Sequence, residues 1–177
     1  FGYSVLNNNQ TTYNRLSFYS NGKIRGSGLY NDVMLSNNTY CEVESGSTQS
    51  ISDSLIAIGG CDGTIMIYSS LPGIEASIAK NLGAIDLIKV ALQDIHGIGG
   101  ASFFAQNSFD LGNNLNWIFT TGSISDRYWV GGNGNWSDTA HWSYTSGGAG
   151  GACIPTPNDN VFVDSNSGFN ANDTVIV

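Results

Sequence analysis

Basic residues are scarce in this sequence. Six Lys and Arg residues stand against 14 Asp and Glu residues, which gives a formal net charge of −8 over 177 residues. Proteins that bind nucleic acids need clustered Lys and Arg to neutralise phosphates, and Lys23 with Arg25 is the only close basic pair. The composition therefore argues against a nucleic-acid partner.

Long apolar runs and paired cysteine motifs are also missing. The sequence has no run of 18 or more apolar residues, so we predict no membrane-spanning segment. It has no CxxC pair either, which argues against a zinc or thioredoxin-like site. No signal peptide is visible. Because the chain opens at Phe1 without Met and ends in a strand-like run, we expect it to be a piece of a longer protein.

Short β-branched and aromatic runs make up the apolar part of the chain. They are separated by turns rich in Gly, Asn, Ser and Thr, as in all-β proteins. We predict strands at 15–20, 32–35, 40–44, 54–58, 64–68, 74–78, 85–92, 101–105 and 116–120. The stretch 74–92 loosely fits a helix, but Ile85, Ile88 and Val90 favour strand and Gly83 interrupts it, so we predict two strands there.

Two all-β architectures are compatible with this pattern. We expect a parallel β-helix, or solenoid-like repeat module, because two-residue hairpin turns between clean alternating runs are largely absent. The dipeptides Asn21-Gly22 and Asp62-Gly63 come nearest to such turns. They keep a β-sandwich as the alternative.

A domain boundary is expected near 121–126. Before it, residues 116–120 form a final strand that closes one unit, and after it the chain is dense in Trp and Gly. We therefore divide the sequence into residues 1–121 and 126–177.

Two blocks carry a resemblance to a known family. The first covers 40–119 and closes with GNNLNW at 112–117, and the second opens with YWVGGNGNWSDTAHW at 128–142. Together they resemble the repeat module of giant Bacteroidota cell-surface proteins exported by type IX secretion, a class that includes the gliding-motility adhesins. By this resemblance, 1–121 is the C-terminal part of one β-solenoid module and 126–177 the N-terminal part of the next.

The resemblance also implies a function. It suggests an extracellular, structural or adhesive segment of a large secreted adhesin, involved in gliding motility or surface attachment. The implied partners are the type IX secretion machinery, cell-surface anchoring proteins, and a surface polysaccharide or another extracellular ligand. A carbohydrate-binding module of a polysaccharide-handling surface protein is the alternative.

The three cysteines are Cys41, Cys61 and Cys153. Residues one coil apart stack in a solenoid, and Cys41 and Cys61 are 20 positions apart (61 − 41). We therefore expect a Cys41–Cys61 disulfide, which would indicate an exported protein, and leave Cys153 without a partner in this chain. The alternative is that Cys41 and Cys61 are unpaired core residues.

Three tryptophans, Trp129, Trp136 and Trp142, lie close together in the sequence. Exposed aromatic faces could form a platform for sugar rings. Large aromatics in a Gly-rich segment more often bury about 150–250 Å² each, so we expect them to cap the open end of a solenoid core.

Catalytic constellations are weak. Glycoside hydrolysis needs two carboxylates about 5–9.5 Å apart, and the candidate pairs are Asp86 with Asp94 and Asp159 with Asp164. Nothing distinguishes them from ordinary surface acids, and no nucleophile–His–acid arrangement has independent support. We predict no catalytic residue, no cofactor and no enzymatic activity.

Asp110, Asn113 and Asn114 form an oxygen-rich turn, which is a weak candidate for calcium. Asp and Asn are also simply good turn residues.

Candidate O-glycosylation sites follow from the resemblance. Exported Bacteroidota proteins carry O-glycans where Asp is followed by Ser or Thr and an apolar residue. This pattern occurs at Ser54, Thr139 and Thr174.

Overall fold

The computed structural model describes residues 4–8, 10–61 and 63–177. It divides into two compact units, which we call the first unit (Phe1–Gly60 and Thr64–Thr121) and the second unit (Cys61–Gly63 and Gly122–Val177). The division between 121 and 122 falls in the interval 121–126 expected from the sequence. The short segment Cys61–Gly63 departs from the expected range 1–121, because it belongs to the second unit. That the two units are parts of tandem modules stays a prediction.

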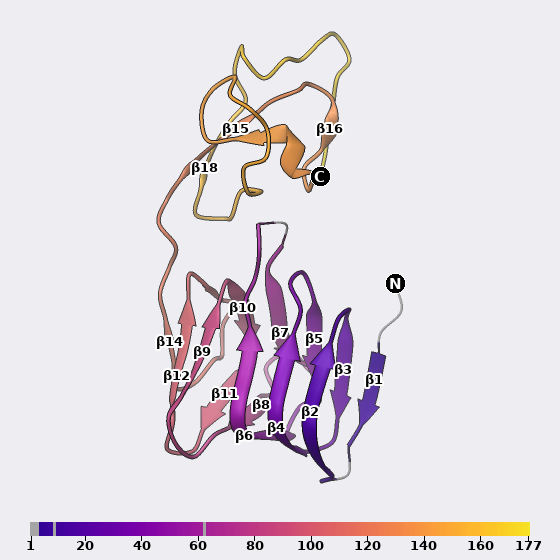
Figure 1. Cartoon of the computed structure of the whole chain (residues 1–177), viewed down its shortest axis with the longest axis vertical. Helices are drawn as coiled ribbons and strands as arrows, with labels where there is room; N and C mark the ends of the chain where they lie inside the picture. The colour runs from indigo at the N-terminus through magenta and orange to yellow at the C-terminus, as the bar shows by residue number, and fades with distance from the viewer. Residues whose placement is uncertain (1–3, 9, 62) are drawn as a thin grey trace. The chain divides into compact units, whose positions relative to one another are not determined.

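The described part of the first unit is built from parallel β-sheets (Figure 1). Its strands are β1 (Ser4–Asn7), β2 (Thr12–Phe18), β3 (Gly22–Arg25), β4 (Gly28–Leu35), β5 (Tyr40–Val43), β6 (Thr48–Ala57), β7 (Ile65–Ser69), β8 (Ala76–Ala79), β9 (Ala84–Ile88), β10 (Val90–Gln93), β11 (Ile95–Ile98), β12 (Ser102–Gln106), β13 (Phe109–Asp110) and β14 (Trp117–Phe119). The sheet orders are β1-β3-β5-β7-β10-β13, β11-β8-β6-β4-β2 and β14-β12-β9.

Parallel pairing is achieved without α-helices in the described residues of this unit. Parallel neighbours need a crossover connection, which in most proteins contains a helix. In this unit the crossover is itself a strand of another sheet: β3 and β5 pair in parallel, and the chain between them runs through β4. The all-β prediction is confirmed, whereas a β-sandwich of antiparallel sheets does not describe this unit.

One of the two hairpin candidates lies in the described residues, and it does not support a sandwich either. Asn21 precedes β3 and Gly22 is its first residue, and β2 and β3 belong to different sheets. Asp62 lies outside the described residues, so the turn at Asp62-Gly63 is not described.

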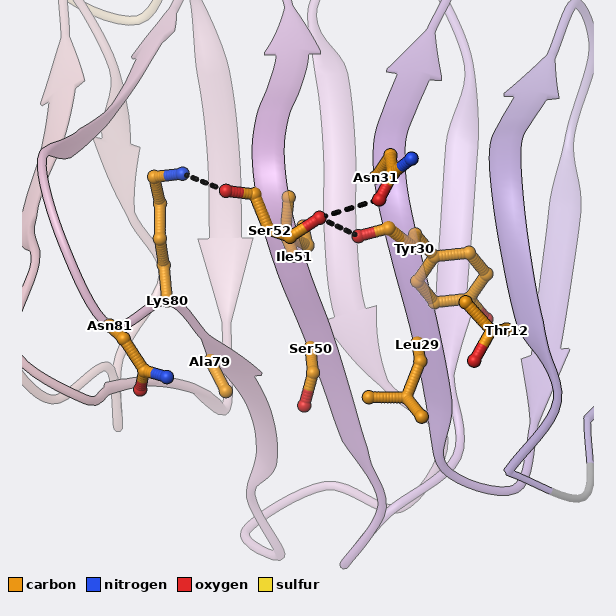
Figure 2. A pocket seen from close by; sticks show the side chains of 10 residues that line it. All are labelled: Thr12, Leu29, Tyr30, Asn31, Ser50, Ile51, Ser52, Ala79, Lys80 and Asn81. Carbon is orange, nitrogen blue, oxygen red and sulfur yellow. Dashed lines mark hydrogen bonds between the residues drawn. The ribbon is translucent and has the colours of Figure 1, made fainter.

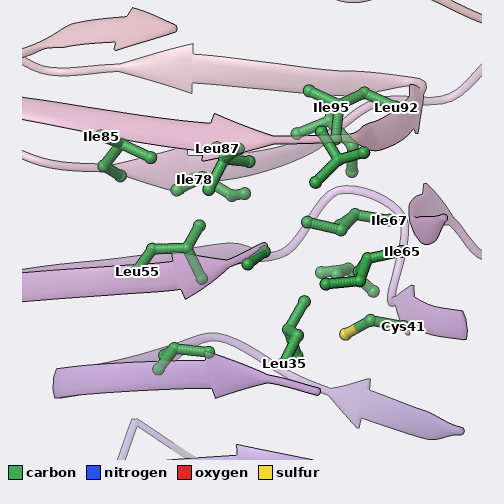
Figure 3. Close-up of a cluster of buried hydrophobic side chains, with 14 of the residues drawn as sticks. Leu35, Cys41, Leu55, Ile65, Ile67, Ile78, Ile85, Leu87, Leu92 and Ile95 are labelled. Atoms are coloured by element: carbon green, nitrogen blue, oxygen red, sulfur yellow. The ribbon is translucent and has the colours of Figure 1, made fainter. Parts of the chain in front are cut away.

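Alternating side chains of these strands meet in one core (Figure 3). In β7, Ile65 and Ile67 are buried while the residues between and after them are half-exposed. The register aligns Cys41, Ile67 and Leu92 on three successive strands of one sheet. Fully burying an aliphatic side chain of this size stabilises a fold by about 1.5–3 kcal/mol, so the stacked positions hold the sheets together.

Sharp turns link the strands, and several depend on left-handed residues. Lys89 (φ 52°) separates β9 from β10, and Asp94 (φ 56°) separates β10 from β11. A single residue in this conformation redirects the chain, so the predicted strand 85–92 is broken into two. The stretch 74–92 thus contributes to β8, β9 and β10, and the prediction of two strands there is one too few.

Regular structure is sparse in the second unit. Its elements are β15 (Asp126–Trp129), β16 (Gly134–Asn135), the 3₁₀-helix η1 (Thr139–His141), β17 (Trp142–Ser143), β18 (Asn160–Phe162) and β19 (Val175–Ile176). Strand β15 pairs antiparallel with β17 and parallel with β18, and β16 pairs parallel with β19. None of the described residues forms a helix long and apolar enough to cross a membrane.

Candidate functional site

The cysteines pair differently from the prediction. Cys61 and Cys153 form a disulfide, and Cys41 is a free, buried thiol. The predicted Cys41–Cys61 disulfide is therefore wrong, because the residues stacked on Cys41 are Gly22 and Ile67. The stacking distance on this side is 26 residues (67 − 41) rather than 20, and Cys61 lies outside the strands.

Cys41 has the chemistry of a core residue. Burial, with a smaller contribution from the charge of Glu42, raises the pKa of its thiol to about 12. The thiolate is the reactive form of cysteine, so this side chain is inert near neutral pH and offers no nucleophile.

Arg127 organises the region around the disulfide. Its Nε donates to the carbonyl of Cys153 at 3.0 Å, and its guanidinium lies 4.7 Å from the ring centroid of Tyr144. Burial tends to raise the pKa of Asp159, but hydrogen bonds from Thr156 and the nearby Arg127 outweigh it and lower that pKa. The arrangement fixes the loop that carries Cys153.

The tryptophans form the core of the second unit. Trp129 and Trp142 are 0% exposed and pack edge to face with ring centroids 5.1 Å apart, while Trp136 is partly buried against them. The indole NH groups donate to the carbonyls of Gly132 and Trp136. A sugar platform formed by the three rings is therefore wrong, because two of them are inaccessible. The burial expected for large aromatics is seen at Trp129 and Trp142; that these rings cap the end of a solenoid core stays a prediction.

The weak calcium candidates bond to protein donors. Asn114 Nδ2 donates to Asp110 Oδ1 at 2.6 Å, and Asn113 Nδ2 donates to Asp94 Oδ1 at 2.7 Å. Asn114 Oδ1 in turn accepts from the backbone N–H of Ile95. Across the described residues there is no group of three or more His, Cys, Asp or Glu side chains that could hold a metal. The turn is held by amide–carboxylate hydrogen bonds.

The carboxylates of the two acidic pairs are held separately. Both oxygens of Asp86 accept from Gln106, at 2.8 and 2.6 Å, while Asp94 accepts from an asparagine of the next turn. Asp159 accepts from Thr156, and Asp164 accepts from a serine hydroxyl at 2.7 Å. Each acid thus has its own structural partner, and no partner bridges the members of a pair.

The three candidate glycosylation sites differ in accessibility. Ser54 is half-buried in β6, and its hydroxyl donates to Asp32 Oδ1 at 2.6 Å. Thr139 is half-buried in η1, and Thr174 is exposed, with its hydroxyl directed to Asn133 Oδ1 at 3.2 Å. Thr174 is the most accessible of the three; their modification stays a prediction.

An ion-pair cluster on the β1–β13 sheet was not predicted. Glu42 accepts from Lys23 Nζ at 3.0 Å and from Arg25 Nη2 at 2.6 Å. Burial tends to raise the pKa of Glu42, but these hydrogen bonds outweigh it and lower that pKa. Both members of the only close basic pair in the sequence are therefore engaged by one carboxylate within the fold, which weakens any role in binding an anionic partner.

A groove lies on the outer surface of the sheet formed by β2, β4, β6 and β8 (Figure 2). Its volume is about 380 Å³, within the range of about 300–1,000 Å³ usual for small-molecule sites. It is lined by Thr12, Leu29, Tyr30, Asn31, Ser50, Ile51, Ser52, Ala79, Lys80 and Asn81. The groove brings an amine, amides and hydroxyls together on one sheet surface.

A break in the strand pairing shapes this region. The register between β4 and β6 shifts between Tyr30 and Asp32, and the alternation of buried and exposed residues in β6 breaks at the exposed pair Ser52 and Asp53. A bulge leaves backbone groups unpaired and bends the strand. Lys80 donates to the two carbonyls at this point, Ser52 O at 3.1 Å and Asp53 O at 2.6 Å.

Comparison with known proteins identified no relative: no family model matches the chain, and neither a curated protein nor a solved structure is similar to it.

Proposed function

We propose that this chain is a structural or adhesive segment of a large secreted bacterial cell-surface protein, built as a β-solenoid. The observation that carries the proposal is the parallel stacking of strands without helices in the described part of the first unit. Solenoids bury their apolar positions by stacking one repeat on the next, and their length grows with the number of repeats. A long protein of this kind can extend away from the cell surface and attach to a distant ligand.

The disulfide supports an exported location. Disulfides persist in oxidising compartments and are rare in the cytosol of mesophiles. The Cys61–Cys153 bond holds two segments that are 92 residues apart in the sequence. A covalent link of this kind suits a protein that works outside the cell and bears load there.

The setting implied by the sequence resemblance belongs to the same proposal. The parent protein is an adhesin of Bacteroidota exported by type IX secretion, and it serves gliding motility or surface attachment. Its partners are the secretion machinery, the proteins that anchor it at the cell surface, and an extracellular ligand. The two units are the end of one module and the start of the next.

The carbohydrate-binding alternative now rests on a different surface of the protein. The buried faces of Trp129 and Trp142 remove the platform first expected for it. The outer surface of the first unit offers another place for a saccharide, because its groove carries polar side chains. Binding of this kind complements an adhesive segment.

Antibodies raised against the purified chain test the proposal in the host. We expect them to label intact cells, and we expect deletion of the coding region to reduce surface attachment or motility. Antibodies against a cytoplasmic protein serve as the permeability control. Labelling that requires permeabilised cells would overturn the exported location, and unchanged attachment and motility would overturn the adhesive role.

A further inference from the structure

Lys80 is a buried cation without an acidic partner. Its residue is 7% exposed, and its ammonium donates to the backbone carbonyls of Ser52 and Asp53. Among the described residues, no carboxylate lies within 4.0 Å of it. A buried charge is unfavourable unless it is paired or fully hydrogen-bonded. An ammonium has three N–H donors, and two of them are accounted for here.

The charge of Lys80 faces the groove. Lys80 and Asn81 form one wall, and the Lys80 side chain extends toward Ser52 across the groove floor (Figure 2). The whole chain carries a net charge of −8, and this overall negative charge repels anions. An anion that binds here must therefore be recognised locally, by contact with this ammonium.

Polar groups continue from Lys80 across the neighbouring strands. Ser52 Oγ donates to Asn31 Oδ1 at 2.7 Å, and Asn31 Nδ2 donates to Asn14 Oδ1 at 2.9 Å. These side chains come from β6, β4 and β2, and adjacent strands lie about 4.8 Å apart. This spacing is comparable to the length of one pyranose ring, so the row can present a polar group to each of several linked sugars.

The groove also offers an apolar surface. Leu29 lines it and is 44% exposed. A sugar ring has C–H faces as well as hydroxyls, and small-molecule sites commonly combine apolar walls with a few fixed polar groups. Leu29 can cover a C–H face, while Asn31 and Asn81 provide amide donors and acceptors for hydroxyls. Asn81 is exposed and makes no hydrogen bond through its side chain in the described residues.

We infer that this groove binds an acidic saccharide, with the carboxylate of a uronate residue paired to Lys80 and the neighbouring hydroxyls bonded to Asn31, Ser52 and Asn81. The inference names a ligand class for the adhesive segment proposed above and rests on that function only for its biological setting. Binding by the purified chain does not depend on where the protein is located. Failure of the groove and failure of the surface location therefore give different results.

Oligogalacturonides and their methyl esters test the inference, because esterification removes the charge of the carboxyl group and leaves the sugar rings and their hydroxyls unchanged. We expect calorimetry on the full chain to show binding of the acid and at least about tenfold weaker binding of the ester, since hydrogen bonds between charged groups are about twice as strong as neutral ones. Binding of the acid should weaken as ionic strength rises to about 1 M, where the Debye length falls to about 3 Å. Equal affinity for acid and ester, or no binding of either, would overturn the inference.

Charge substitutions locate the site without removing Lys80 from its carbonyl bonds. Asn81→Asp places a negative charge on the groove wall and should weaken acid binding about fivefold or more. Asn107→Asp makes the same chemical change on an exposed turn of the first unit that does not line the groove, and it should leave binding unchanged. Equal effects of the two variants would place the interaction elsewhere.

Two further measurements separate this site from alternatives. Lys80→Met should abolish the preference for acid over ester, and circular dichroism checks that the variant folds; if it does not fold, the Asn81 and Asn107 pair decides. Dextran sulfate is the polyanion control. Binding of dextran sulfate that matches oligogalacturonide and is insensitive to Asn81→Asp would show a nonspecific polyanion interaction and overturn the assignment to a uronate.

Discussion

The two units of this chain reach stability by different means. The first unit stacks aliphatic side chains from successive parallel strands, and its cysteine is an unbonded core residue. The second unit has 59 residues (56 in 122–177 and three in 61–63), short strands, a core around Trp129 and Trp142, and a disulfide. Domains of this size bury a smaller fraction of their surface and commonly need such reinforcement. The comparison shows two ways to stabilise a β-rich unit: repeated stacking of strands in the first unit, and an aromatic core with a disulfide in the second.

The largest expected effect is the loss of an indole from the second unit. Trp142→Ala should destabilise it by about 3–5 kcal/mol, which is comparable to the whole stability of a unit this small. We expect the NMR signals of the second unit to lose the chemical-shift dispersion of a folded protein, while the signals of the first unit keep it. Leu87→Ala in the first unit, where the side chain is also 0% exposed, should lower stability without abolishing that fold.

Trp136→Ala is the control for the second unit, because the ring is only partly buried. It should have a smaller effect than Trp142→Ala. If Trp142→Ala instead unfolds both units together, the two regions are one cooperative system and the contrast between them disappears.

Removal of the disulfide should have the second-largest effect on stability. Cys61→Ser should lower the stability of the second unit by about 2–4 kcal/mol, mainly through a less constrained unfolded chain. Thermal unfolding with and without reductant measures this, and the first unit should be insensitive to reductant. Loss of stability in the first unit alone would contradict the assignment.

Thiol labelling checks the pairing directly. The native oxidised chain should expose no reactive thiol, because Cys41 is buried with a raised pKa and the other two cysteines are bonded. Reductant should release two reactive thiols, and unfolding should release the third. One reactive thiol in the native oxidised chain would contradict either the Cys61–Cys153 bond or the burial of Cys41.

Acid should weaken both units through lowered carboxyl pKa values. The pKa of Glu42 is lowered in the first unit and that of Asp159 in the second. A lowered pKa contributes stability that is present above the unfolded pKa, about 4, and is lost as pH falls through the folded pKa. Glu42→Gln should therefore destabilise the first unit by about 1–3 kcal/mol at pH 7 and flatten its stability profile below pH 4.

Denaturant titrations over a pH series measure this effect. Asp159→Asn is the counterpart in the second unit, and Asp138→Asn, a change at an exposed acid that makes no ion pair among the described residues, is the control. An unchanged acid transition in Glu42→Gln would show that the ion pairs with Lys23 and Arg25 do not stabilise the fold.

The sequence was informative about strands and poor on pairing across the chain. The alternation around Ile65 and Ile67 predicts a strand correctly, because side-chain periodicity is local. The partner of Cys61 is not predictable in this way, since stacking distances vary with turn length and place Cys41 against Ile67. The sequence does not mark Lys80 as a buried cation, because this residue follows the strand Ala76–Ala79 as an ordinary surface lysine would. Its role depends on carbonyls at Ser52 and Asp53, which no local pattern reveals.

Substitutions at left-handed turn residues should have the smallest effect on stability, and the effect should be the same in both units. Asn107 (φ 50°) in the first unit and Asn172 (φ 74°) in the second are both exposed and left-handed. Substitution by Ala should cost about 1 kcal/mol, because Ala keeps the Cβ that crowds a left-handed backbone and lacks the polar side chain that lets Asn adopt it, whereas Gly, which has no Cβ, should be nearly neutral. Denaturation midpoints of the four variants measure this. If Gly destabilises as much as Ala, the asparagine side chain and not the backbone angle determines the turn, and any difference between units then reflects the packing around it.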